Sequence, residues 1–542
     1  MAVVERPGAG IGANGREPAV QIAPTPEPPP RVAWRQRLDV RRWPATRQFL
    51  LALIVLYVAK GMLNVLVFPA FTGHDEVAHY AHLAVVATDH RLPRVPQLDE
   101  WRADYEAAQF QHVPTGDYVP ANLYRYCRYF ISQDWYCAPD DPTWSQSPPY
   151  AVTYLDEYFP SGWIYTANHP PLYYLLMTPV YWATDGASPA AQQYALRAAA
   201  IPFGLLTILC AYLLAVTLFA RETFLAITVP AFVAFQPQVS YEAAMLNNDI
   251  VAIAFYSLVL YLLVRGLRDR FPWRLCVLTG AALGLALLAK GTAVTAAPMI
   301  ALAVVLGVGW RDVRGWLAKG AVMAGVAGLV SSPWFIFLYR TYGNFDAMEQ
   351  VLRLQYWNFL NRDRPSILDQ LWNRDFAAMR WKETWGMFGW RRIHLGDGLL
   401  WAIGIVCLVA LAGLVWYAVL VVRRPDRTAA DPVLRLQRWQ VHGLVLMLTT
   451  AVVAYLAILE FGTRFELTQA RYYFPAINAI ALLLMLGLRT LIPRGVRHYG
   501  QAGVLVALLL MNVLIYTQYV IPYWHTEGPT PNPLERFLSD DE

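Results

Sequence analysis

The segment at residues 71–82, FTGHDEVAHYAH, carries the residue types needed for proton transfer and directly follows a long apolar run. In a helix, the adjacent carboxylates of Asp75 and Glu76 would each lie one turn from His79. One carboxylate can then accept a proton while the other holds a metal ion or orients a ring nitrogen. We interpret Asp75 and Glu76 as catalytic candidates, and His74 and His79 as substrate contacts. The alternative is a solvated helix start, where the helix dipole favours acidic side chains.

A second polar segment, Asn168-His169-Pro170-Pro171, precedes another apolar stretch. Proline is tolerated in the first turn of a helix, so the Pro pair predicts a helix entry. His169 would project from this entry at the level of the membrane surface, where we expect it to contact substrate. The alternative is a loop histidine that only hydrogen-bonds to the entry turn.

A third polar segment, Asn247-Asn248-Asp249, stands at the start of a further apolar run. We interpret Asp249 as a second catalytic carboxylate and Asn248 as a substrate contact. Asn and Asp at this position are also good helix caps. The two interpretations are compatible.

Two cations stand at the ends of apolar runs. Lys290 lies in LLAKGTA, and Arg471 lies in QARYYFPA beside Tyr472. A fixed cation at headgroup depth would hold a lipid phosphate, so we expect all three residues to bind substrate. The alternative for the cations is that they extend to lipid headgroups.

The segment WKETWGMFGWRRIHLGDG at 381–398 combines aromatic and basic residues, among them Trp390. Such a surface can contact lipid tails and phosphates or stack on sugar rings, and we take Trp390 as a substrate contact. Anchoring at the membrane interface would explain the same residues.

The composition is that of a membrane protein with many spans. Hydrophobic residues make up 56% of the 542 residues and charged residues only 15%, which leaves too little polar surface for a soluble chain of this length. The net charge of +5 is mild and clusters beside apolar runs, so it indicates topology and not nucleic-acid binding. The apolar runs lie near residues 49–71, 194–219, 224–242, 247–264, 275–290, 292–309, 320–340, 398–422, 441–461, 472–488 and 502–521.

Basic residues predict the topology. Six arginines between Arg31 and Arg47 precede the first run, so the N-terminus is expected inside the cell. Counting from this and later basic connections gives about eleven spans. The stretch 171–184 is short and contains Pro179, so we interpret it as a half-inserted or interfacial helix. The expected divisions are a disordered cytoplasmic tail at 1–45, a membrane domain at 46–522 with large outer loops at 72–170 and 341–397, and an outer tail at 523–542.

The first large loop contains two of the five cysteines, Cys127 and Cys137. If this loop is extracytoplasmic, a disulfide between them is plausible, although spacing alone does not fix its geometry.

Together these motifs resemble the GT-C superfamily of integral-membrane glycosyltransferases. The resemblance rests on the acidic pair after the first run, the HPPLYY entry, the polar loop ending at Asp249, LLAKG, FGW and ARYYFPA. It covers most of residues 47–522, and bacterial relatives of protein mannosyltransferases and aminoarabinose transferases are the most similar. It implies an all-α bundle of membrane helices in a bacterial inner membrane, with a polyprenyl-phosphate sugar as donor and a glycan, lipid or protein as acceptor.

The resemblance also implies roles for individual residues. Asp75 matches the position of the catalytic base, with Glu76 assisting; Asp249 matches the second acidic position; Lys290 and Arg471 match the contacts to the donor phosphate. A divalent metal ion held by Glu76 and His169 is a further expectation, although some relatives have an acidic residue where His169 stands. The expected reaction is an inverting sugar transfer. The alternative function is a transporter or flippase of a lipid-linked saccharide, which would use the same charges to pass a headgroup.

Overall fold

The structure is a computed structural model. It describes residues 43–95, 164–346, 365–389, 391–423, 431–465 and 468–526, together with isolated positions between 116 and 159. The chain divides into two units, residues 1–48 and residues 49–542. Most of the first unit, including the predicted tail up to residue 42, lies outside the described residues, as do 527–542.

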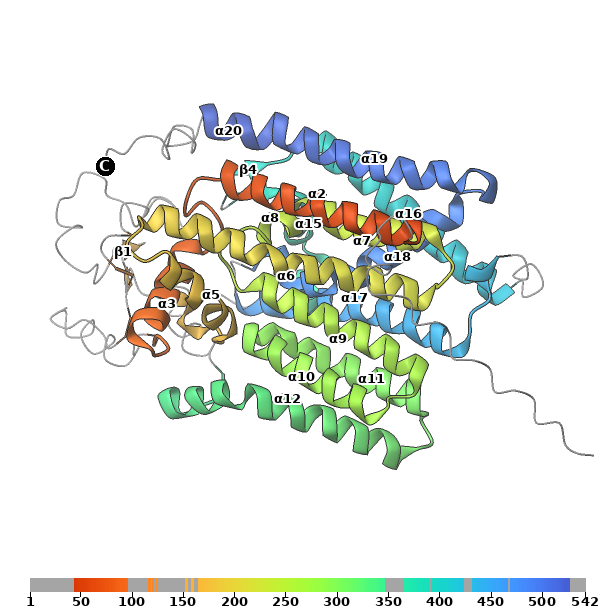
Figure 1. The fold of residues 1–542 in the computed structure, drawn as a ribbon, viewed down its shortest axis with the longest axis horizontal. Helices are drawn as coiled ribbons and strands as arrows, with labels where there is room; N and C mark the ends of the chain where they lie inside the picture. The colour runs from red at the N-terminus through yellow and green to blue at the C-terminus, as the bar shows by residue number, and fades with distance from the viewer. Residues whose placement is uncertain are drawn as a thin grey trace, which may run out of the picture. The chain divides into compact units, whose positions relative to one another are not determined.

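The second unit is a bundle of long apolar helices, which confirms the predicted all-α membrane class (Figure 1). Among the described residues, nine helices are long and apolar enough to cross a membrane. They are α2 (Ala45–Val67), α6 (Pro189–Leu218), α9 (Asp249–Asp269), α11 with its preceding turn η5 (Gly291–Val308), α12 (Val313–Tyr342), α16 (Asp397–Arg423), α17 (Arg438–Arg464), α18 with η8 (Ala470–Leu491), and α19 with the helical turns around it (Arg494–Trp524).

Two further apolar helices are shorter. They are α7 (Thr223–Phe235) and α10 (Trp273–Ala289), with 13 and 17 residues. Because a span needs about 20 residues, the total of eleven spans stays a prediction.

Glycines allow close contact between α16 and α18. A Cβ atom at Gly487 would lie 1.8 Å from the carbonyl oxygen of Ala410, and one at Gly413 would lie 2.2 Å from the carbonyl oxygen of Gly487. The two backbones therefore touch directly, as small residues permit in membrane bundles.

Helix α7 ends at Phe235, two residues before Pro237, which has no N–H to donate to a continuing helix. The chain restarts as the short helix α8 (Pro237–Glu242). Neighbouring helices satisfy the carbonyl groups that the break releases. The ammonium group of Lys60 on α2 lies 3.5 Å from the carbonyl oxygen of Ala234, and the side-chain amide of Asn512 on α19 donates to Phe235 at 2.8 Å.

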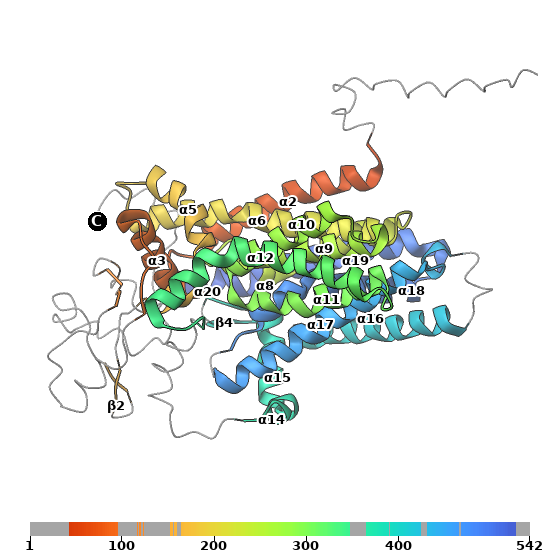
Figure 2. The ribbon, with the colours of Figure 1, turned by 90° about the horizontal axis from the view of Figure 1, so that it is seen from below.

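Several short elements lie outside the long helices, some at one end of the bundle and others projecting from its side (Figures 1 and 2). They are α3 (Glu76–Asp89), η4 (Tyr165–Asn168), α5 (Leu172–Ala183), α14 (Ile367–Trp372), α15 (Arg374–Trp385), and the antiparallel pairs β1–β2 (Val152–Tyr154 with Glu157–Phe159) and β3–β4 (Met387–Phe388 with Ile393–His394). Helix α5 has only 12 residues and contacts α3 and α6. Its length does not suffice for a span, and its insertion into the bilayer stays a prediction.

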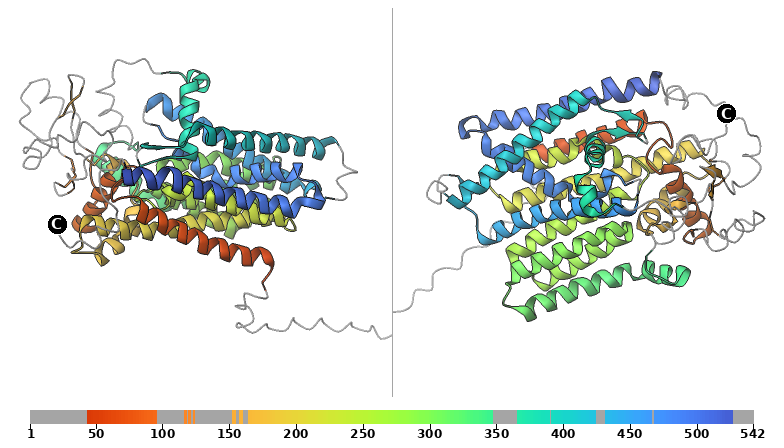
Figure 3. Two further views of the ribbon diagram at one scale, coloured as in Figure 1. Left: turned by 90° about the horizontal axis from the view of Figure 1, so that it is seen from above. Right: turned by 180° about the vertical axis from the view of Figure 1, so that it is seen from behind.

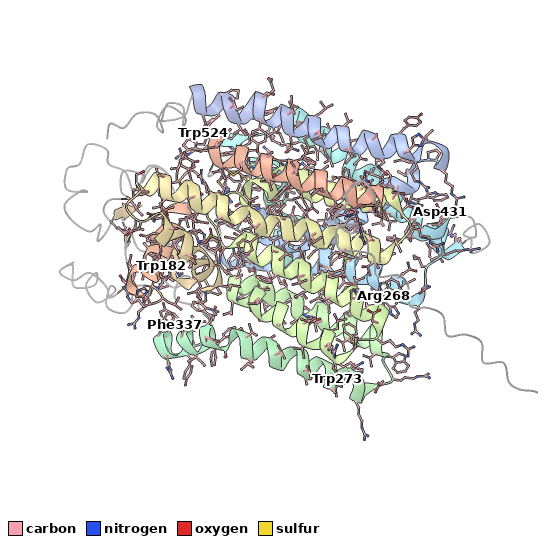
Figure 4. All side chains as sticks on the ribbon, in the orientation of Figure 1. Trp182, Arg268, Trp273, Phe337, Asp431 and Trp524 are labelled. Atoms are coloured by element: carbon pink, nitrogen blue, oxygen red, sulfur yellow. The ribbon has the colours of Figure 1, made fainter. Side chains whose placement is uncertain are left out.

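The two ends of the bundle differ in their chemistry. Figure 4 places Arg268 and Asp431 at one end, and Trp182 and Trp524 at the other. At the first end the buried guanidinium of Arg489 donates to Asp431 at 2.7 and 2.9 Å and to Glu222 at 2.5 Å. This network joins the connections that follow α6 and α16 to the last turn of α18.

Candidate active site

The carboxylate of Asp75 contacts Arg471, although 396 residues separate the two in sequence. Asp75 ends the connection after α2 and has left-handed backbone angles, with φ at 61°. Its second oxygen accepts a hydrogen bond of 2.9 Å from the hydroxyl of Tyr165. The carboxylate keeps 14% of its surface exposed, so it is reachable while paired.

Asp249 and Lys290 form a second pair at the same place. Asp249 begins α9 and Lys290 ends α10, and the ammonium nitrogen lies 2.5 Å from a carboxylate oxygen of Asp249. The other Asp249 oxygen lies 3.6 Å from Nε of Arg471. Tyr472 covers the pair, with its ring 4.7 Å from the Lys290 nitrogen.

Asn248 contributes in a different way from the one expected. Its side-chain amide donates to the carbonyl oxygen of Ala289 at 2.8 Å and so ties the start of α9 to the end of α10. This contact positions Asp249 opposite Lys290. Asn248 as a substrate contact stays a prediction.

A third carboxylate, Glu242, lies beneath the cluster and is fully buried at the end of α8. It lies 3.3 Å from Nδ1 of His74 and 4.0 Å from Nη1 of Arg471, and it accepts from Gln238 at 3.1 Å. Glu242 is not among the site residues predicted from the sequence. A signal that could have identified it is the Gln236-Pro237 pair, which predicts a helix break five residues before an acidic residue in an apolar run.

Glu76 serves a different purpose from its neighbour. Its side chain is fully buried and its two oxygens accept four hydrogen bonds: from Nε and Nη2 of Arg197 at 2.8 and 2.5 Å, from Gly73 N–H at 2.7 Å and from Leu246 N–H at 2.8 Å. These donors occupy both oxygens. These contacts give Glu76 a structural role, and its assistance in catalysis or its binding of a metal ion stays a prediction.

The two histidines of α3, His79 and His82, stack on neighbouring rings. Nδ1 of His79 lies 2.8 Å from the hydroxyl of Tyr174, and the His82 ring stacks on the Tyr174 ring at 3.4 Å between centroids. His169 stacks on His79 at 5.6 Å, nearly parallel. Burial, together with nearby positive charge, lowers the pKa of His79 and of His169 well below the usual range. Both rings are therefore neutral at physiological pH and present polar ring edges.

The donor set does not fit a metal ion. Within the described part of the chain, no three His, Cys, Asp or Glu side chains are grouped so that they could hold one. The acids of the cluster are held apart by Arg471 and Lys290, and Glu76 is occupied. Trp390, Cys127 and Cys137 lie outside the described residues.

The cluster retains hydrogen-bonding capacity. Among the described residues, Nε and Nη1 of Arg471 and one oxygen of Asp249 are buried without a partner within hydrogen-bond distance. Buried polar groups are nearly always satisfied. A ligand that both accepts from Arg471 and donates to Asp249 would complete this set.

The protonation state of Asp75 follows from its partners. Burial raises its pKa, but the charge and hydrogen bond of Arg471, helped by His74 and Tyr165, outweigh burial and hold the pKa below its usual range. Asp75 is therefore ionised at neutral pH.

Comparisons with known proteins support the resemblance seen in the motifs. A family model described as dolichyl-phosphate-mannose-protein mannosyltransferase matches residues 168–337. No curated protein matches the chain. The matched stretch contains His169, Glu242, Asp249 and Lys290, which are four of the site residues above.

Three solved structures match the chain weakly. ArnT from Cupriavidus metallidurans in the apo state is 17% identical over 88% of this chain and 66% of that one, with a TM-score of 0.40. An oligosaccharyltransferase from Archaeoglobus fulgidus, in complex with zinc and sulfate, is 14% identical over 90% of this chain and 57% of that one, with a TM-score of 0.41. ArnT from Cupriavidus metallidurans bound to undecaprenyl phosphate is 14% identical over 86% of this chain and 79% of that one, with a TM-score of 0.33. The chain thus spans 66% and 57% of the first two structures. The family match confirms the resemblance of this multi-pass membrane protein to the GT-C glycosyltransferase superfamily.

Proposed function

We propose that this protein transfers a sugar from a polyprenyl-phosphate donor to an acceptor at the outer face of the membrane. One observation supports this proposal above all others. Two cations and three carboxylates from distant parts of the chain meet at one end of the apolar helices, and Nε and Nη1 of Arg471 are buried without a hydrogen-bond partner among the described residues. The family match over 168–337 agrees with this chemistry.

The cations suit the leaving group of such a transfer. When the bond between the anomeric carbon and the phosphate oxygen breaks, the polyprenyl phosphate departs with the electron pair and gains one negative charge. Arg471 and Lys290 stabilise that charge, which develops only as the bond breaks. The lipid tail remains among the apolar helices, so the phosphate reaches the cations without crossing the hydrocarbon core.

Asp75 suits the role of general base. It removes the proton from the acceptor hydroxyl or amine as that atom attacks the anomeric carbon, which inverts the configuration. In its resting pair with Arg471 it is a weak base, because its pKa is lowered. A donor phosphate that accepts from Arg471 takes over this partner and releases Asp75. The proton that Asp75 then accepts offsets the charge that the phosphate brings.

The decisive test is Asp75→Asn in purified protein reconstituted in vesicles, with a labelled polyprenyl-phosphate sugar and membranes that supply the acceptor. We expect a loss of transfer of at least about 100-fold, with the protein still folded, because Arg471 keeps Asp249 and Glu242 as neighbours. Glu460→Gln is the matched control, because Glu460 is an exposed acid paired with Arg464, and it should leave transfer unchanged.

The assay also separates transfer from transport. A glycosyltransferase forms a new glycosidic bond and releases the lipid phosphate, whereas a flippase only relocates its intact cargo. Asp75→Asn with undiminished transfer, or wild-type protein that moves the donor without cleaving it, would contradict the proposal.

A further inference from the structure

We infer that Glu383 is a positioning residue that fixes Arg471, acting through a strap formed by residues 380–389. This inference rests on the proposed function, because it assigns Glu383 a purpose in binding the donor phosphate. The strap comprises the end of α15 and the strand β3. Figures 2 and 3 show α14 and α15 extending from the bundle and crossing the direction of the long helices.

The first side of the strap contacts the backbone that carries Arg471. An oxygen of Glu383 accepts a hydrogen bond of 2.8 Å from the N–H of Ala470, the residue directly before Arg471. Arg380 donates to the carbonyl oxygen of Thr468, and Arg391 donates to the same oxygen at 3.1 Å. Three hydrogen bonds therefore hold the short segment that leads into η8.

The second side of the strap contacts the broken helix that carries Glu242. Gln238 on α8 exchanges two hydrogen bonds with the backbone of Met387, at 3.2 and 3.3 Å. The N–H of Gly389, whose φ is +57°, donates to the hydroxyl of Tyr241 at 3.1 Å. The strap thus joins α8 to η8, the two elements whose charged side chains, Glu242 and Arg471, face each other in the site.

Glu383 is the electrostatic centre of the strap. It is 5% exposed, and it lies 2.8 Å from Nε of Arg380 and 2.5 Å from Nη2 of Arg391. Its single negative charge lies between two guanidinium groups that donate to one carbonyl oxygen, and it offsets their mutual repulsion. Without that charge the two cations repel each other, and the cost of a buried charge lacking its partner is several times that of a surface pair.

Loss of the Glu383 charge should therefore move the Thr468–Ala470 backbone and, with it, Arg471. Among the described residues, Glu383 contacts Arg380, Arg391 and the N–H of Ala470 and not Asp75, Asp249 or Lys290, so we expect its effect on the donor to pass through Arg471. This dependence separates positioning from a general effect on folding. A general effect would add to the effect of removing Arg471, whereas a positioning effect disappears once Arg471 is gone.

The experiment is a double-mutant cycle on full-length protein in nanodiscs, with undecaprenyl phosphate as the probe. We expect Glu383→Gln to weaken lipid binding by roughly tenfold, as for the loss of one charge-assisted hydrogen bond. In an Arg471→Ala background the same change should alter the Kd by less than about twofold, because the two residues act as one unit. Glu383→Asp keeps the charge and should bind closer to wild type, and Glu460→Gln is the exposed control.

The outcomes are distinct. Equal binding by wild type and Glu383→Gln, or the same weakening with and without Arg471, would overturn the inference and leave the proposed function standing. Wild-type protein that neither binds the lipid nor transfers sugar would overturn the proposed function and this inference with it. If Glu383→Gln does not fold, the cycle is run with Glu383→Asp, whose shorter side chain lengthens the contact to the N–H of Ala470 and should weaken lipid binding by less than Glu383→Gln does. No weakening at all, or a weakening that persists in the Arg471→Ala background, would overturn the inference.

Discussion

Substitution of Glu76 by glutamine separates the two adjacent acids, which are alike in sequence and different in structure. Glu76 and Arg197 are both fully buried. Each Glu76 oxygen accepts from one Arg197 nitrogen and one backbone N–H, of Leu246 or of Gly73. In Glu76→Gln, either orientation of the amide turns its NH₂ group toward two N–H donors.

The cost can be estimated in two ways. Two buried donors left without an acceptor cost about 1–3 kcal/mol each. Removal of one partner from a buried ion pair costs about 3–5 kcal/mol. The two estimates overlap, and either is a large part of a typical unfolding free energy of about 5–15 kcal/mol. We expect the thermal midpoint to fall by roughly 10 °C, because the charge of Arg197 remains buried.

Differential scanning fluorimetry of the purified protein measures this fall. Two variants calibrate it: Glu460→Gln, which breaks an exposed pair and should cost less than about 1 kcal/mol, and Asp75→Asn, which should lose transfer while remaining folded. A Glu76→Gln protein that unfolds at the wild-type temperature would refute the structural role. If this Glu76→Gln protein also lost transfer activity, Glu76 would instead take part in catalysis.

Three further outcomes follow from the described contacts. Burial lowers the pKa of His82 to about 3, so between that pH and the unfolded pKa of about 6.5 only the unfolded chain binds this proton. The free energy of unfolding should therefore fall as the pH drops from about 6.5 to about 3. His82→Phe should flatten this dependence in unfolding midpoints measured over a pH series. Gly487→Ala should lower the midpoint sharply because its Cβ would overlap a backbone carbonyl of α16, whereas Gly325→Ala, which meets no atom within 4 Å, should not. Lys290→Met should weaken lipid-phosphate binding and leave Asp249 paired only with Arg471, which a Kd measurement with undecaprenyl phosphate detects.

The arrangement of the site could be predicted where polar residues interrupt apolar runs. Each of the four residues Asp75, Asp249, Lys290 and Arg471 stands at the end of such a run, and the arginine-rich connections predict that these ends share one side of the membrane. The structure brings the four side chains together, as the topology required. Their individual roles remain proposals.

The partners of the acids could not be predicted from the sequence. Glu76 and Asp75 are neighbours, yet one turns inward to Arg197 and the other toward Arg471, and this choice depends on the left-handed backbone at Asp75. Glu383 lies on α15, within a segment predicted as an outer loop, and the strap that contains it contacts η8 and α8. Such pairings depend on tertiary distances that hydropathy does not encode.

The position of the site within the bundle follows from the cost of unsatisfied backbone in a membrane. Non-helical backbone at bilayer depth persists only where protein buries it or where it lines a cavity. Three interruptions meet here: the α7–α8 break at Pro237, the change from α10 to η5 after Lys290, and the turn η8 around Arg471. Each exchanges helical hydrogen bonds for side-chain contacts. A bundle that only spanned the membrane would gain no stability from this exchange. All three breaks lie beside charged residues of the cluster, which indicates that the breaks position those charges.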